Sequence, residues 1–151
     1  VILDSLNENR VGVAASVLGV ARGAFEEALE FAKTRIVRGK PIIEYQAVAH
    51  RLADMATDIE TARWMVYWGA WQVDNGTLTN AAASKVKLVA SEAAIRVTEN
   101  AIRVMGGAGI MRDHSVGMHH RDALVYVIGE GTSDIQRNII GRALRKGEME
   151  A

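Results

Sequence analysis

Apolar residues recur at steps of three and four positions along the first part of the chain, between about Asn9 and Lys33. This spacing places them on one stripe of a helix, as in helices that pack one face against a core. The positions that form the stripe are Ala14, Val17, Leu18, Ala21, Phe25, Ala28, Leu29 and Ala32. The pattern predicts a first long helix over residues 9–33.

Two further segments have the same periodicity. The tract 38–41 breaks the first helix, and a second is predicted from about Glu44 to Val73, closed by Asn75-Gly76 as a C-cap. A third begins near the capping residues Thr79-Asn80 and ends at the glycine tract 106–109. The apolar positions of these two segments are Val48, Leu52, Met55, Ile59, Ala62 and Val66, then Ala82, Val86, Val89, Ala93, Val97, Ala101 and Val104.

The remaining residues predict two shorter helices, one near Met118–Tyr126 and one from Ser133 to about Lys146. No segment alternates between apolar and polar residues for long, so no sheet is expected. Three helices of roughly 25 to 30 residues joined by short connections indicate an all-α fold, an antiparallel up-and-down helical bundle.

Three tryptophans lie on one stripe of the second predicted helix. Trp64, Trp68 and Trp71 are spaced by four and three residues. Two interpretations remain open: the indoles pack within the chain, or they form a surface that is buried against a partner subunit or a further domain, where Trp is enriched.

The composition narrows the class of protein. A chain of 151 residues with 49% hydrophobic residues has the size of one domain with a real core. Lys+Arg and Asp+Glu both number 18, so no charge excess indicates a nucleic-acid binder. No apolar run approaches the roughly 18 residues of a membrane span, and no signal peptide opens the chain. Because residue 1 is Val rather than Met, we expect residues 1–151 to be a single domain of a longer protein.

The absence of cysteine excludes a disulfide, a thiol nucleophile and a Cys-based metal site, and fits a cytoplasmic protein. Three histidines cluster at His114, His119 and His120. The first two are five residues apart in a turn-rich segment, without the four-residue spacing of a helical ligand pair. We therefore expect no metal site.

One carboxylate stands between two glycines near the C-terminus, in the sequence Gly129-Glu130-Gly131-Thr132. It follows an apolar run and precedes a predicted helix. A carboxylate with little solvent around it has the raised pKa that suits a general base, and thin backbone lets a substrate approach. The alternative is a C-cap glycine followed by a Thr N-cap, with Glu130 a solvated loop charge.

Six landmarks in order carry a resemblance to a known family. They are the tract Arg35-Ile36-Val37-Arg38-Gly39-Lys40-Pro41, then Gln46, Leu52-Ala53-Asp54-Met55, Gly106-Gly107-Ala108-Gly109, Arg121-Asp122-Ala123 and Glu130-Gly131-Thr132. Together they cover nearly the whole chain, which resembles the C-terminal α-helical domain of the acyl-CoA dehydrogenases.

The resemblance implies FAD-dependent α,β-dehydrogenation of an acyl-CoA thioester, with Glu130 as the base that takes the α-proton. Arg10 matches an arginine near the substrate, and Gly131 would let the thioester lie close to the backbone. Some family members carry the base at the start of the first helix instead. The matching position here is Asn9, which cannot take a proton, so Glu130 remains the candidate.

Other matches fall on positions that contact FAD in the family. Arg35 resembles an arginine that reaches the FAD pyrophosphate across a subunit interface. Gln46 resembles a glutamine that hydrogen-bonds the adenosine portion. Gly106 and Gly107 resemble a turn that lies against the cofactor, and Thr132 a residue next to the flavin.

Three further positions expected to contact FAD depart from the family pattern. Arg38 replaces the usual Phe, Arg103 stands where Gln is frequent, and Asp134 where Gln or Glu is common. Arg38 would add a phosphate contact or stack by its guanidinium plane.

The resemblance also implies an acyl-CoA substrate, an electron-transfer flavoprotein as acceptor, and a homo-oligomer, either dimer or tetramer. Two alternatives stay open: an acyl-CoA oxidase or flavin monooxygenase relative, and a helical oligomerisation module whose flavin site is vestigial. Because the family holds its flavin partly with an N-terminal helical domain and a middle β-domain, we expect residues 1–151 alone to bind FAD weakly and to have no turnover.

Overall fold

The computed structural model describes residues 2–148, with side chains from residue 5 onward, and every predicted helix is present. The long helices are α1 (Ile2–Thr34), α2 (Gln46–Asp74) and α3 (Asn80–Met105), and the short ones are α4 (Val116–Ile128) and α5 (Ser133–Arg145). Helix α1 begins at Ile2 rather than Asn9, and the other ends lie within two residues of the predicted ones. Two 3₁₀ segments, η1 (Ile42–Glu44) and η2 (Gly106–Ile110), lie between them.

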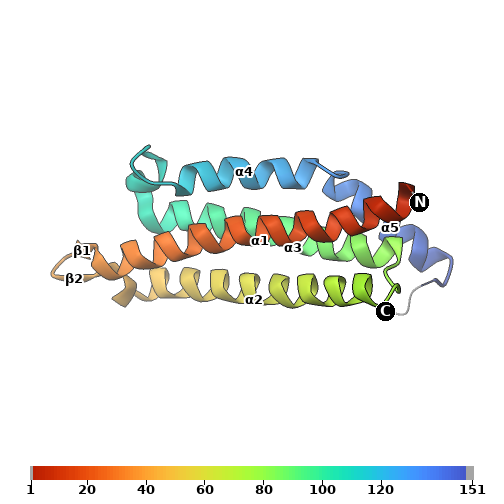
Figure 1. Ribbon diagram of the computed structural model, residues 1–151. Helices are drawn as coiled ribbons and strands as arrows, with labels where there is room; N and C mark the ends of the chain where they lie inside the picture. Colours follow the sequence, from red (N-terminus) through yellow and green to blue (C-terminus); the bar gives the residue numbers. More distant parts are fainter. Residues whose placement is uncertain (1, 149–151) are drawn as a thin grey trace.

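The helices run up and down, as the short connections predict. Helices α1 and α3 lie side by side in the middle of the molecule, with α2 along one side and α4 along the other (Figure 1). Helix α5 packs against α3 near the N-terminus of α1. In residues 2–148 no helix has the length and apolar character that a membrane crossing would need.

Small side chains form the seam between α1 and α3. The buried positions of α1 are Val11, Ala14, Val17, Ala21, Ala24, Ala28 and Ala32, and those of α3 include Ala83, Val86, Ala90, Ala94, Val97 and Ala101. Alanine on both faces lets the two helix axes approach closely, toward the lower end of the interaxial distances of about 8–10 Å that are usual for packed helices. The core is therefore tight where α1 meets α3, and larger residues such as Met55 and Leu52 of α2 close its flank.

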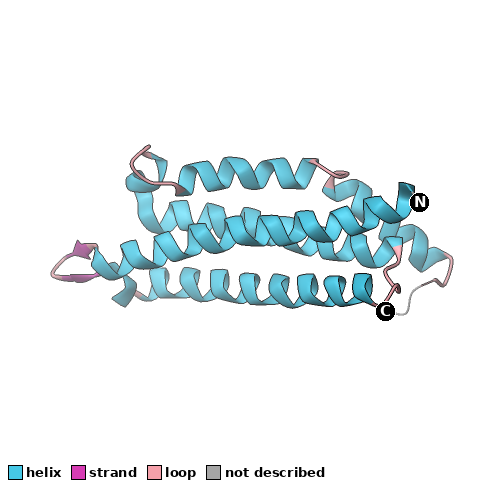
Figure 2. Ribbon diagram, viewed as in Figure 1, coloured by secondary structure: helices cyan, strands magenta, loops and turns pink. Residues whose placement is uncertain are grey.

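The expectation of no sheet is wrong at one small hairpin. Strands β1 (Ile36–Val37) and β2 (Lys40–Pro41) pair antiparallel around Arg38 and Gly39, whose φ angles are 48° and 84° (Figure 2). Two positive φ angles at the centre of a two-residue turn are typical of a hairpin. Strands of two residues are too short to show alternation, which is why the sequence pattern did not reveal them.

The tryptophan stripe does not pack within the chain. Trp64, Trp68 and Trp71 are 65%, 38% and 59% exposed, and Tyr67 between them is 59% exposed. Burial of the opposite face of α2, including Met55, Ile59 and Val66, leaves the aromatic face pointing away from the core. Of the two interpretations, the chain supports a surface available to another subunit or domain.

A carboxylate on α1 fastens the turn between η2 and α4. Ser115 Oγ donates to Glu27 Oε2 at 2.5 Å, the Ser115 N–H donates to Glu27 Oε1 at 3.3 Å, and His114 Nδ1 lies 2.9 Å from the same oxygen. Burial raises the pKa of Glu27, but these hydrogen bonds and the His114 charge outweigh it and leave the pKa below its ordinary value. His114, one of the three clustered histidines, thus has a structural partner in Glu27.

The Glu27 contacts predict a pH-dependent contribution to stability. Glu27→Gln should lower the free energy of unfolding by about 1.5–3 kcal/mol near pH 7, because hydrogen bonds to a charged group are lost. Since the folded pKa is lowered, the stabilisation is full above the ordinary value of 4.5 and disappears as the pH falls through the folded pKa. Urea denaturation at about pH 7 and about pH 3 measures the difference.

Glu26→Gln is the matched control. Glu26 pairs with Arg22 at 3.0 Å, but the two side chains are 61% and 63% exposed. Exposed pairs contribute roughly 0.2–1 kcal/mol, so the control should lose clearly less stability. Equal losses in the two variants at neutral pH would contradict the special role of Glu27.

Candidate functional site

The candidate residues separate into two groups at opposite ends of the bundle. Glu130, Arg10 and Thr132 lie at the end where α1 begins, while Arg35 and Gly106 lie at the end of the β1–β2 hairpin (Figure 1). Helix α1 runs between them, and its 1.5 Å rise per residue puts about 36 Å between Arg10 and Thr34. One chain therefore presents two separate sites.

Glu130 occupies a strained loop between α4 and α5. Its φ is +54°, and that of Gly131 is +90°. A non-glycine residue in this left-handed region costs of order 1–3 kcal/mol, and such strain persists where neighbouring contacts hold it. Gly129 is the C-cap of α4 and Thr132 the N-cap of α5, so the capping alternative is correct for both neighbours.

The Glu130 side chain is exposed, so the expectation of little surrounding solvent is wrong for the residues described. The loop follows an apolar run, but Ile128 and Val125 on that run are themselves exposed, at 65% and 64%. Within the part of the chain that the structure describes, no side chains enclose the carboxylate. Any shielding has to come from a bound molecule or another part of the protein.

Arg10 is half-buried beside this loop and fixed by two asparagines. Its Nη1 donates to Asn7 Oδ1 at 3.0 Å and to Asn80 Oδ1 at 2.6 Å. Burial lowers the pKa of Arg10, and the negative charge of Glu130 acts in the opposite direction. Arg10 and Glu130 therefore lie at the same end of the bundle, near enough for their charges to interact.

Two buried polar residues at this end were missed in the sequence. Lys87 on α3 and Gln136 on α5 both have 0% exposure. Lys87 Nζ donates to the carbonyl of Gly131 at 3.0 Å, and Gln136 Nε2 donates to the carbonyls of Glu130 and Gly131 at 3.0 and 2.9 Å. Burial, and then the positive charge of Arg10, lowers the pKa of Lys87, which Glu92 and Glu130 partly oppose.

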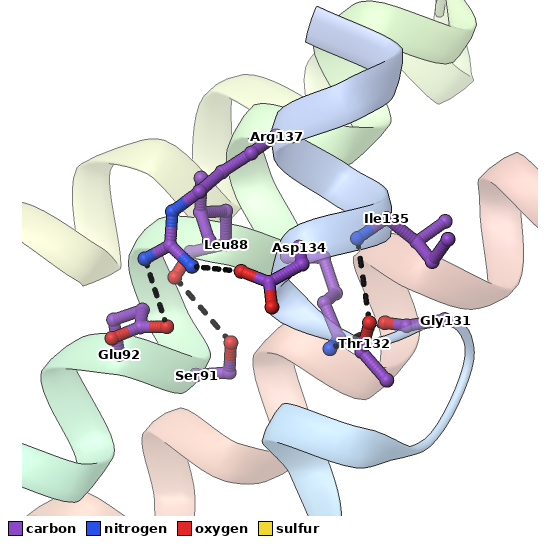
Figure 3. Close-up of polar contacts among 9 residues, drawn as sticks. Leu88, Ser91, Glu92, Gly131, Thr132, Asp134, Ile135 and Arg137 are labelled. Atoms are coloured by element: carbon purple, nitrogen blue, oxygen red, sulfur yellow. Dashed lines mark hydrogen bonds and ion pairs between the residues drawn. The ribbon is translucent and has the colours of Figure 1, made fainter.

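Local contacts and one ion pair to α3 hold the start of α5. The Thr132 hydroxyl accepts from the Ile135 N–H at 3.3 Å, and Arg137 pairs with both Asp134 and Glu92 at 3.1 Å (Figure 3). Asp134 is a predicted cofactor contact. Its side chain pairs with Arg137 and is 88% exposed. Thr132 remains able to face a ligand through its free side, because its cap uses only the hydroxyl oxygen.

The hairpin end contains a pocket of about 650 Å³. Arg35, Arg38, Gly106 and Gly107 are among its lining residues, with Phe31 and Tyr45 on the apolar side. Open space surrounds the position of a Cβ on Gly106 or Gly107, so their backbone is bare toward the pocket. Neither arginine forms an ion pair within residues 5–148. Two free guanidinium groups beside bare backbone suit a phosphate or pyrophosphate.

The other two predicted cofactor residues at this end do not line the pocket. Gln46 is the exposed first residue of α2. Arg103 is exposed in the last turn of α3 and bound to Glu99, with Nη2 2.5 Å from Oε1. Arg103 is therefore already neutralised by a neighbour on its own helix.

Comparisons with known proteins show the family to which the chain belongs. The family described as acyl-CoA dehydrogenase, C-terminal domain, matches residues 1–145. An acyl-CoA dehydrogenase of Bacillus subtilis is 42% identical over 147 residues, covering 97% of this chain and 39% of the relative. The caffeyl-CoA reductase-Etf complex subunit CarC of Acetobacterium woodii is 39% identical over 144 residues, covering 95% and 38%.

A solved structure gives the same result. Butyryl-CoA dehydrogenase from Megasphaera elsdenii matches with a TM-score of 0.92 and 39% identity, over 95% of this chain and 37% of that one. The chain spans less than two-fifths of the length of these relatives. By its motifs, its fold and the extent of these matches, the chain belongs to the acyl-CoA dehydrogenase family and corresponds to the C-terminal domain.

Proposed function

We propose that this chain is the C-terminal domain of an FAD-dependent acyl-CoA dehydrogenase and that it supplies the catalytic base. The observation that carries the proposal is the Glu130 loop. The Glu130 backbone is held at φ +54° by a buried donor, beside a fixed arginine, and this strain has a free-energy cost that a solvated loop charge would not need. The arrangement is well explained as a base held in one direction.

In the proposed reaction the Glu130 carboxylate takes the proton from the α-carbon of the thioester. The electron pair of that C–H bond forms the α–β double bond, and the β-hydrogen leaves with its own pair as hydride. Bound FAD would supply the acceptor for that hydride. The α-proton becomes acidic only when the thioester carbonyl is polarised, and the Glu130 N–H is a donor suited to it. Arg10 would keep the carboxylate oriented through its charge.

The hairpin pocket is proposed to hold the phosphates of FAD. Its donor set of Arg35, Arg38 and the bare backbone of Gly106 and Gly107 fits a pyrophosphate. Arg38 stands at the tip of the hairpin, where its charge compensates for the aromatic residue usual in the family. Gln46 and Arg103 would reach the cofactor only from outside this pocket.

The separation of the two sites supports a homo-oligomer. With about 36 Å of α1 between them, the base and the phosphate pocket of one chain would serve two different flavins. The exposed aromatic face of α2 offers a surface for such an assembly, as dimer or tetramer. An electron-transfer flavoprotein is the proposed acceptor, in line with the Etf complex named for the relative from Acetobacterium woodii.

A helical assembly module with a vestigial flavin site is the second candidate. The observation in its favour is the replacement of the usual Phe by Arg38 in the cofactor motif. A module of this kind would have no use for the strained Glu130 loop, so the dehydrogenase is favoured.

Glu130→Gln should abolish most of the activity of the full-length flavoprotein. We expect anaerobic bleaching of the flavin absorbance by an acyl-CoA to slow by about 10²–10⁴-fold while flavin stays bound, because the base is lost and the shape is kept. Stopped-flow absorbance with a panel of acyl-CoAs measures the rate. The thioester that bleaches the wild type identifies the substrate class.

Glu8→Gln is the control, since Glu8 is an exposed carboxylate on α1 at the same end. Its bleaching rate should match that of the wild type. Flavin that no thioester bleaches in the wild type would favour the oxygen-using relatives, and a full-length protein without flavin would favour the assembly module.

Arg35→Gln should weaken FAD binding to the full-length apoprotein by about 10- to 100-fold, the value of one lost charge-assisted hydrogen bond. Fluorescence titration with FAD measures the change. Arg22→Gln, at an exposed arginine of α1 that pairs with Glu26, should leave the affinity unaltered. Equal FAD affinity in wild type and Arg35→Gln would remove the pocket from the proposed cofactor site.

A further inference from the structure

The backbone of the Glu130 loop is held from beneath by two side chains on different helices. Three hydrogen bonds of 2.9–3.0 Å reach the carbonyls of Glu130 and Gly131, one from Lys87 Nζ and two from Gln136 Nε2. Both donors are fully buried, so water does not compete for these carbonyls.

The conformation that these bonds hold is one that the loop would not keep by itself. Glu130 and Gly131 have consecutive positive φ angles, and only the second is a glycine. A peptide in this conformation is free to relax unless its surroundings fix it. Because the donors act on the carbonyls that follow Glu130 and Gly131, they fix the peptide planes on the C-terminal side of the base.

Gly131 is shaped to this contact as well. A Cβ at residue 131 would lie 2.8 Å from Gln136 Nε2, closer than real Cβ contacts allow. The amide of Gln136 is tied to two carbonyls and buried, so it has no room to move away. The absence of a side chain at residue 131 therefore leaves space for the Gln136 amide. This role differs from that of letting a substrate approach the backbone.

Within residues 5–148, the buried Lys87 amine has one hydrogen-bond partner, the Gly131 carbonyl. Its neighbours along the buried face of α3 are Ala83 and Ala90. An apolar residue at position 87 would fit between them without the free-energy cost of removing an amine from water. We therefore attribute the buried amine to its hydrogen bond with the Gly131 carbonyl.

We propose that Lys87 and Gln136 are positioning residues that clamp the Glu130–Gly131 backbone and thereby fix the direction in which Glu130 presents its N–H and carboxylate. This inference rests on the proposed function of Glu130 and adds the residues that prepare it. Neither side chain touches the reacting atoms; both act through the backbone of the base.

The test uses the full-length flavoprotein with Lys87→Met, Gln136→Met and the double variant, which remove the donors and keep side-chain length. Thr98→Val is the matched control, because Thr98 is also fully buried on α3 and hydrogen-bonded, to the Ala94 carbonyl at 2.7 Å. Two readouts are collected: anaerobic flavin bleaching at saturating acyl-CoA, and hydrogen exchange of the Ile135 and Gln136 amides, which donate to Thr132 directly after the loop.

At saturating acyl-CoA, the flavin of each single variant should bleach about 10- to 100-fold more slowly than that of the wild type. The flavin content and the half-saturating concentration of the thioester should stay unchanged, because misalignment of the base slows the reaction without weakening binding. The double variant should fall by less than the product of the singles, because both donors hold one backbone segment. Exchange at Ile135 and Gln136 should quicken about tenfold in both singles and stay unchanged in Thr98→Val.

Wild-type bleaching rates in both singles would overturn the clamp, as would a double variant equal to the product of the singles. Faster exchange spread along all of α3 would assign Lys87 a general structural role and would also overturn it. If Lys87→Met does not fold, the same criteria apply to Gln136→Met, which removes only a neutral amide. If no acyl-CoA bleaches the wild type, the proposed function fails, and the exchange experiment still decides the clamp.

Discussion

The close packing of α1 against α3 is the constraint on which the rest of this structure depends. Alanines on both faces, such as Ala14 and Ala21 opposite the α3 stripe, let two long helices run side by side with little between them. That contact fixes the register of Arg10 on one helix against Asn80 and Lys87 on the other. A wider seam would separate these polar groups, so the geometry around Glu130 is a consequence of core packing as much as of loop sequence.

Much of the fold could be predicted because its helices are long and strictly periodic. The stripe from Ala14 to Ala32 and the caps at Thr79 and Thr132 all have their expected roles. The hairpin at Arg38 was not predictable, since its strands are too short to carry a pattern. The sequence correctly places the three tryptophans on one face of α2. Periodicity alone, however, does not distinguish a core from a surface that another chain covers.

The site was predictable where a residue is defined by its own chemistry and not where it is defined by its surroundings. Glu130 stands out between glycines, whereas Lys87 looks like one of many lysines on a helix. One signal was available: Lys87 lies four residues after Ala83 and three before Ala90, which places it on the same helix face as these two alanines. A lysine there is indistinguishable in sequence from one whose stem lies on the core while its amine reaches water. Only the hydrogen bond from Lys87 to the Gly131 carbonyl, in the loop before α5, distinguishes the two cases.

The distance between the two ends of α1 has a consequence for inheritance. If every active centre takes Glu130 from one chain and Arg35 from another, two mutant alleles that each inactivate the protein can restore one another. In a mixed assembly of Glu130-deficient and Arg35-deficient chains, one centre combines both lesions and another combines neither. A carrier of the two alleles would then retain part of the activity that carriers of two copies of either allele lack. The long, straight helix that holds the core together would thus set which pairs of mutations complement.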